Sequence, residues 1–215
     1  MHWLAYQLAD SAFPIGGFSH SSGLEAFVEL GEVNSAEGLA TFLDAFVLNT
    51  ASASGPFFTA AHSAPADLPA IHLRFDATIA SHVTRRASLT QGRTLLATAK
   101  SIFTADALAI LPIHQGPFHF APLFGSLLRS LHLPIDEAAR IFIYSQLRGV
   151  VSAAVRLGIV GPHEAQRLQH ARSARLDQAL IKMMNTPMHL AAQTAPSFDA
   201  FCTLHDRLYS RLFQS

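Results

Sequence analysis

The side chains best suited to chemistry are concentrated in residues 10–25, which read Asp-Ser-Ala-Phe-Pro-Ile-Gly-Gly-Phe-Ser-His-Ser-Ser-Gly-Leu-Glu. Ser19, His20 and Ser21 stand together there, so a serine nucleophile with a histidine base is one chemistry to consider. Adjacent residues rarely form such a pair, and the Gly-x-Ser-x-Gly elbow is missing. The Gly-x-x-x-x-Gly-Lys-Ser/Thr phosphate loop is also missing. A small helical hydrolase built on these three residues is therefore an alternative and not the leading interpretation.

The same stretch has the residues of a bent loop that opens a helix. Pro14 restricts its own φ angle, and Gly16 and Gly17 can adopt positive φ. Ser22 stands three residues before Glu25, which is the spacing of a capping box at a helix start. We expect a tight turn, a helix from residue 22 onward, and phenylalanine, serine and histidine side chains exposed on the loop.

Metal chemistry is weakly indicated. The 12 histidines are scattered along the chain, and none forms the His-x-His or His-x-x-x-His spacing that aligns ligands on a strand or helix. The single cysteine, Cys202, excludes an intramolecular disulfide and fits a reducing compartment. We expect no metal site within one copy of the chain. A nickel-binding chaperone with a site shared across a dimer axis is a second alternative.

The composition indicates surplus apolar surface. Hydrophobic residues make up 50% of the chain and charged residues 14%, whereas globular domains carry about 25% charged residues. We interpret part of this surplus as an interface with another protein. Acidic and basic residues balance at 15 each, so nothing favours nucleic acid or anionic lipid. The chain shows no secretory signal and no apolar run of about 20 residues, so we expect a cytoplasmic protein without a membrane span.

Apolar residues recur at helical spacing throughout, and no segment shows the sustained alternation of a strand. The sequence therefore predicts one all-α domain over residues 1–215, packed as a multi-helix bundle. Asn34 and Glu37 have the spacing of a capping box at a helix start. The helix that begins there should bury Leu39, Phe42, Leu43, Phe46 and Val47. The other expected helices cover residues 3–9 and 22–30, begin at Gly55 and Asp67, and cover residues 77–100 (with Gly92 as a weak point), 119–131, 135–159, 162–184 and 198–213.

The helix expected over residues 135–159 has two different faces at about 100° per residue. Its core face holds Ile135, Ala138, Phe142, Gly149 and Ala153. Its opposite face carries a polar stripe that consists of Glu137, Arg140, Tyr144 and Arg148. The last three are spaced four apart and form one ridge. We interpret this ridge as a docking surface, because Tyr and Arg often carry interface energy; a solvated polar face is the alternative.

Arg156 differs from the ridge residues because it projects toward the apolar side of the same helix. A lone buried charge is costly. We therefore expect a carboxylate, or several carbonyls at a helix C-terminus, next to its guanidinium group.

Several segments resemble the UreF family of urease accessory proteins. Residues 10–25 are similar to the N-terminal signature of that family, and residues 84–96 to its central segment with recurring Arg, Ser and Gly. Residues 119–125 resemble its His-x-x-Pro-x-x-Gly variant. Residues 150–162 resemble its C-terminal block, and residues 209–215 its usual ending. These segments follow in the family's order and span most of the chain.

The resemblance implies an all-α homodimer that is not an enzyme. It implies binding to UreD (also called UreH), recruitment of the nickel-carrying GTPase UreG with modulation of its activity, and action of the complex on urease apoprotein. Nickel and GTP would then be handled by the complex, with no cofactor in this chain. It implies that Arg140 and Tyr144 take part in recruiting UreG, and that residues 210–215 contribute to the contact with UreD.

Together, the loop, the ridge and the resemblance predict a set of partner-binding residues. The set comprises Asp10, Pro14, Gly16, Gly17, Ser19, His20, Ser21, Gly23, Glu25, Arg140, Tyr144, Arg148 and Arg211.

Overall fold

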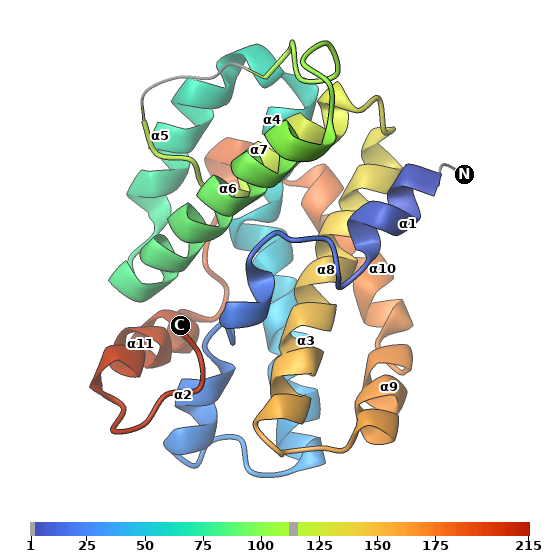
Figure 1. Ribbon diagram of the computed structural model, residues 1–215. Helices are drawn as coiled ribbons and strands as arrows, with labels where there is room; N and C mark the ends of the chain where they lie inside the picture. The colour runs from blue at the N-terminus through green and yellow to red at the C-terminus, as the bar shows by residue number, and fades with distance from the viewer. Residues whose placement is uncertain (1–2, 112–115) are drawn as a thin grey trace.

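The computed structural model describes residues 3–111 and 116–215, and within these residues every regular element is a helix (Figure 1). The all-α prediction is confirmed. In chain order the helices are α1 (Trp3–Ala9), η1 (Gly17–Ser19), α2 (Leu24–Glu29), α3 (Ala36–Ala53), α4 (Gly55–Ser63), η2 (Pro65–Asp67), α5 (Leu68–Thr78), α6 (His82–Ile102), α7 (Phe120–Ser130), α8 (Ile135–Arg156), α9 (Pro162–His170), α10 (Ser173–Asn185), η3 (Met188–Leu190), α11 (Pro196–Leu204) and η4 (His205–Arg207). No helix in the described part of the chain has the length and hydrophobicity needed to cross a bilayer.

The core faces of the two longest predicted amphipathic helices are largely confirmed. All five apolar residues expected to face inward on α3 are buried. On α8 the buried residues include Ala138, Phe142 and Ala153, while Gly149 is half-buried. The start of α3 is off by one residue from the prediction. Ser35, not Asn34, caps the helix, and its side chain accepts a hydrogen bond from the Gly38 amide at 3.1 Å.

Two expected helices are wrong in their extent. The segment expected as one helix over residues 162–184 is split into α9 and α10, because the chain bends at Arg172. That residue is buried, donates to the Leu168 carbonyl, and has its Nε 3.3 Å from Asp44 Oδ1 on α3. The helix expected over residues 198–213 ends with η4, and residues 208–215 continue as a non-helical segment that we call the tail. In both places contacts distant in sequence override a helical pattern.

Helix α7 lies at the centre of the upper half of the bundle and packs against α4, α5, α6 and α8 (Figure 1). All its residues except Arg129 are buried. The backbone of α4 comes so close that a Cβ atom on Gly125 would lie 2.2 Å from the Phe58 carbonyl oxygen. Gly92 on α6 is equally constrained, since a Cβ there would lie 1.8 Å from the Phe118 carbonyl oxygen. Gly92 is therefore a contact point inside a continuous helix and does not break it.

A buried histidine joins α5 and α6 to the start of α7. His119 Nε2 lies 2.8 Å from Asp76 Oδ1, its Nδ1 lies 3.1 Å from Ser88 Oγ, and its backbone amide donates to His72 Nδ1. Arg85 also binds Asp76 through two nitrogens and thereby lowers the pKa of that carboxyl group. Burial lowers the pKa of His119 although Asp76 opposes the shift. These bonds satisfy both ring nitrogens, as a buried polar group requires.

The close crossing of α4 and α7 yields the first prediction. Gly125→Ala should lower the free energy of unfolding by about 1–3 kcal/mol, because a methyl group must displace the α4 backbone. Gly149→Ala on α8 is the matched control, since a Cβ there meets nothing within 4 Å. The control should raise the free energy of unfolding by about 0.5–1 kcal/mol through helix propensity. Urea denaturation of both variants measures these changes, and equal effects would contradict the packing argument.

Candidate functional site

The N-terminal loop (residues 10–23) is held in its bent path by backbone conformations that favour glycine. Gly16 and Gly23 have φ angles of 73° and 89°, and Ser22 also has a positive φ of 56°. The predicted capping box is therefore wrong: α2 begins at Leu24, and Ser22 does not cap it. Ser21 takes that place, because its hydroxyl oxygen accepts from the Glu25 amide at 3.3 Å. The Glu25 side chain is thereby left available for another contact.

The tail runs along this loop and is hydrogen-bonded to it. The Gln214 amide donates to the Ser19 carbonyl at 2.8 Å. The amide and the hydroxyl group of Ser21 both donate to the Ser215 carbonyl, at 2.6 and 2.8 Å. Residues nearly two hundred positions apart thus form one continuous surface. Figure 1 shows the end of the chain next to η1 and above α2.

Glu25 is the anchor of the tail. Its carboxylate is buried and accepts hydrogen bonds from the Leu212 and Phe213 amides and from His205 Nε2, the last at 2.7 Å. It also stands in the first turn of α2, where a negative charge is favoured by the helix dipole. A buried carboxylate is tolerated only when it is paired and hydrogen-bonded. The tail supplies much of that pairing.

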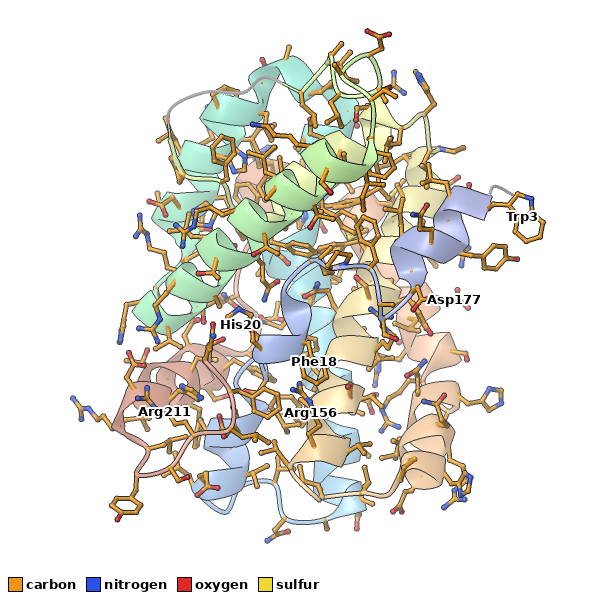
Figure 2. All side chains as sticks on the ribbon, in the orientation of Figure 1. Trp3, Phe18, His20, Arg156, Asp177 and Arg211 are labelled. Carbon is orange, nitrogen blue, oxygen red and sulfur yellow. The ribbon has the colours of Figure 1, made fainter. Side chains whose placement is uncertain are left out.

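Arg156 clamps the loop and the tail from below. Its guanidinium carbon lies 3.8 Å from the centre of the Phe18 ring and 4.1 Å from the centre of the Phe213 ring. Figure 2 shows Arg156 directly beside Phe18 at the end of α8. The expected direct pairing with a carboxylate or with helix carbonyls is wrong, because among the described residues this side chain makes no hydrogen bond or ion pair. Two aromatic faces stabilise its charge. Burial lowers the pKa of Arg156, and the Glu25 carboxylate opposes this shift from a distance, so a nearby carboxylate contributes without a direct contact.

The loop borders two cavities. One, of about 250 Å³, is lined mainly by apolar side chains together with His20, Cys202 and Ser215. The other, of about 150 Å³, lies between the loop and α8 and is lined by Pro14, Gly16, Arg148 and Arg156 among others. The two share His20 in their walls. The Cys202 thiol is buried, and burial raises its pKa to about 11, so it is unreactive in the folded chain. It lines the same cavity as Ser215 of the tail, so release of the tail should open a path to it.

The three residues of the hydrolase alternative do not form a catalytic arrangement. His20 is buried and its Nδ1 lies 2.6 Å from Ser215 Oγ. Ser19 Oγ donates to the Gly16 carbonyl, and Ser21 Oγ donates to the Ser215 carbonyl. In the described ranges no carboxylate contacts the His20 ring, and neither serine has a base. The expectation of exposed loop side chains is wrong for His20, Ser21 and Phe13, which are buried, whereas Phe18 is exposed as expected.

The remaining loop residues have structural contacts of their own. Asp10 accepts from the Ala12 amide at 2.8 Å and so closes the turn after α1. The Pro14 carbonyl accepts from Thr98 Oγ1 on α6 at 2.7 Å. Gly17 begins η1, and a Cβ on Gly23 would lie 2.6 Å from Cys202 Sγ. Gly23 is therefore required both by its φ angle and by the close approach of α11.

The predicted ridge on α8 is only partly exposed. Arg140 is exposed and pairs with Asp177 on α10 at 3.3 Å. Tyr144 is half-buried. Arg148 is half-buried and donates to the Ala9 carbonyl at 2.9 Å, so it fastens the end of α1. The ridge therefore presents its Arg140 end to solvent, whereas Arg148, about 12 Å further along α8, belongs to the wall beneath the loop.

Arg211 lies on the exposed tail, and its Nη1 is 3.3 Å from Asp206 Oδ1. Arg86 on α6 binds the same carboxylate through both terminal nitrogens, at 2.7 and 3.0 Å. Sequence reasoning missed Arg86, Asp206 and the aromatic partners of Arg156. No local signal could have revealed the pairing of Arg86 with Asp206, or of Arg156 with its two rings, since the partners lie far apart in the chain. Among the described residues, no group of three His, Cys, Asp or Glu side chains is placed to hold a metal ion.

Comparison of the sequence with known proteins finds relatives along the chain. The UreF family model matches residues 33–173. Urease accessory protein F of Arabidopsis thaliana is 38% identical, with 100% of this chain and 93% of the relative covered. Urease accessory protein F of Oryza sativa subsp. japonica is 34% identical, with 98% of this chain and 84% of the relative covered. The UreF protein of Paenarthrobacter aurescens is 27% identical over 97% of this chain and 96% of its own length.

The clamp formed by Arg156 predicts how the tail is retained. Arg156→Ala should release the tail and raise the rate of Cys202 alkylation by roughly tenfold, given about 0.5–2 kcal/mol for each cation–π contact. Arg156→Lys should give an intermediate rate, because it keeps the charge but loses the planar group. Arg167→Ala on the exposed side of α9 is the control. Wild-type alkylation rates for Arg156→Ala would show that the two rings do not hold the tail.

The buried state of His20 predicts a pH dependence. Burial, followed by the nearby Arg86 and His205, lowers the pKa of His20 from 6.5 to about 4. Between these values the unfolded chain binds a proton that the folded chain does not. Stability should therefore fall as the pH falls from 6.5 toward 4, by up to about 1.4 kcal/mol per pH unit for this group.

The variant His20→Asn, which can still bond Ser215, should flatten that slope in urea titrations at several pH values. His163→Asn on the surface of α9 should leave the slope unchanged. The lowered pKa values of His62 and His119 act in the same direction, so part of the slope should remain in His20→Asn. An unchanged slope in His20→Asn would contradict the assignment.

Proposed function

Since this chain belongs to the UreF family of urease accessory proteins and takes part in urease maturation, we propose that it is a non-catalytic docking subunit. In this proposal it binds UreD (UreH) and the GTPase UreG, and the complex inserts nickel into urease apoprotein. Nickel is the cargo of the complex, and GTP is bound by UreG. The chain supplies surfaces that position its partners.

One observation carries the proposal: the loop and the tail are joined into a single structured surface with exposed apolar groups. Phe18 is 71% exposed, Leu212 is 60% exposed, and Tyr209 is fully exposed. Phe18 contacts Arg156 with its ring but leaves most of its surface in water, and exposed apolar patches of this kind are typical of protein–protein contacts. Glu25 and Arg156 hold the backbone behind them, so little ordering is required on binding. We assign this surface to UreD.

The Arg140 end of α8 is a second surface on another side of the molecule. Trp3 is 88% exposed at the outer end of α1, and its ring lies 6.1 Å from that of Tyr6. Figure 2 shows Trp3 and Asp177 on the right and Arg211 on the left. Two partners can therefore bind at once without competing for one face. We assign the Arg140 end of α8 as the surface that binds UreG.

The mechanism that we propose is positioning. The chain holds UreG next to UreD and the urease apoprotein, so that GTP hydrolysis by UreG is coupled to nickel release. We also propose that the chain is a cytoplasmic homodimer. Support for the dimer comes from large apolar side chains that are exposed away from both surfaces, such as Leu73 and Ile102. Support for the reducing compartment comes from the free thiol of Cys202.

The double variant Arg140→Ala with Tyr144→Ala tests the UreG assignment. Capture of UreG by the chain bound to UreD should fall by at least about tenfold. Truncation of hot-spot residues to alanine typically lowers the binding free energy by more than about 1–2 kcal/mol. Helicity, dimerisation and UreD binding should not change. Arg167→Ala provides the control for loss of a surface charge. Capture of UreG at the wild-type level would remove this end of α8 from the proposal.

A further inference from the structure

One carboxylate on the tail side of the molecule binds more cationic groups than it can neutralise. Asp206 Oδ1 lies 2.7 Å from Arg86 Nη2 and 3.3 Å from Arg211 Nη1, and its Oδ2 lies 3.1 Å from His82 Nε2. All three partner side chains are about half exposed. The pKa of Asp206 lies far below its usual range, chiefly because Arg86 donates to it.

Arg207 follows Asp206 directly and is exposed. Within residues 3–111 and 116–215 it makes no ion pair or side-chain hydrogen bond. Arg86 and Arg211 therefore bring two positive charges to the single negative charge of Asp206, and Arg207 adds a third at the next position of the chain. Among the neighbouring acids, Arg85 already neutralises Asp76, and Glu25 is buried with His205. Asp199 on α11 is half-buried and reduces the positive excess by at most one charge, so an excess remains.

The unused hydrogen-bond donors face solvent beside apolar groups. Arg211 uses one of its five N–H donors on Asp206, and Arg207 uses none within the described residues. Tyr209 and Leu212 are exposed on the same tail. A guanidinium group binds a carboxylate through paired donors. The apolar neighbours Tyr209 and Leu212 favour a carboxylate on a partner protein over a free inorganic anion as the ligand.

We infer that Arg86, Arg207 and Arg211 form a basic docking site for an acidic segment of the protein that covers the tail. This inference rests on the proposed partner contact of the tail, and it adds the chemistry of the partner's surface. The partner contributes one or more Asp or Glu side chains, which complete the neutralisation that Asp206 begins. Because the arginines of this chain and the partner's carboxylates are exposed, added salt should weaken the association.

Two variants with opposite charge changes test the site. Arg207→Gln breaks no internal contact and should weaken UreD binding about two- to fivefold at low salt, the range for one exposed ion pair. Asp206→Asn releases Arg86 and Arg211 and should strengthen binding by a similar factor. Arg74→Gln, an exposed arginine on α5 away from the tail, is the matched control. Cys202 alkylation checks that the tail stays in place in each variant.

A probe that does not require UreD separates this inference from the proposed function. Hexaglutamate should bind the isolated chain at low salt, more weakly in Arg207→Gln and more tightly in Asp206→Asn. If UreD does not bind the wild-type chain but hexaglutamate follows this order, the proposed partner is wrong and the acidic docking site stands. If hexaglutamate and UreD bind all variants equally, the inference is overturned. Competition by inorganic phosphate with unchanged UreD binding would likewise overturn it, in favour of a small-anion site.

Discussion

The buried carboxylate of Glu25 is the contact on which the candidate surface depends. A carboxylate at that depth is unstable unless its oxygens are hydrogen-bonded. Here the two amides of the tail and the His205 ring satisfy it. The tail therefore docks because the start of α2, directly after the N-terminal loop, carries an acceptor that needs donors. The loop is in turn hydrogen-bonded to the tail through Ser19 and Ser21, so the two segments stabilise each other.

Helix α8 connects this surface to the rest of the molecule. Along one helix, Arg140 reaches solvent, Arg148 holds the end of α1, and Arg156 lies between two phenylalanine rings. The three arginines have the same chemistry and yet have different roles, because each meets a different neighbour. A single rigid helix therefore sets the distance between the two surfaces that we assign to different partners. The buried helix α7 and its close glycine contact with α4 form the packed core of the upper half of the bundle.

Local patterns predicted the helices well wherever a residue's partners lie one or two turns away. The inward face of α3 and much of the core face of α8 follow directly from apolar spacing. The predictions were wrong where a side chain had a choice of partner. Glu25 has the spacing of a capping residue, but it binds the tail. Arg172 lies within a helical pattern, but it turns inward to Asp44 and ends α9. Periodicity contains no information about such distant acceptors.

The sequence by itself determined the all-α class, the apolar faces of the main helices and the family to which the chain is similar. These properties depend on residue type and on spacing within a few turns, and both can be read along the chain. Only the tertiary structure decided that the tail lies on the loop, that Arg156 is held by aromatic rings, and that Asp206 gathers cations from α6 and from the tail. Those contacts join residues up to nearly two hundred positions apart, and only packing of the whole chain brings them within hydrogen-bond distance.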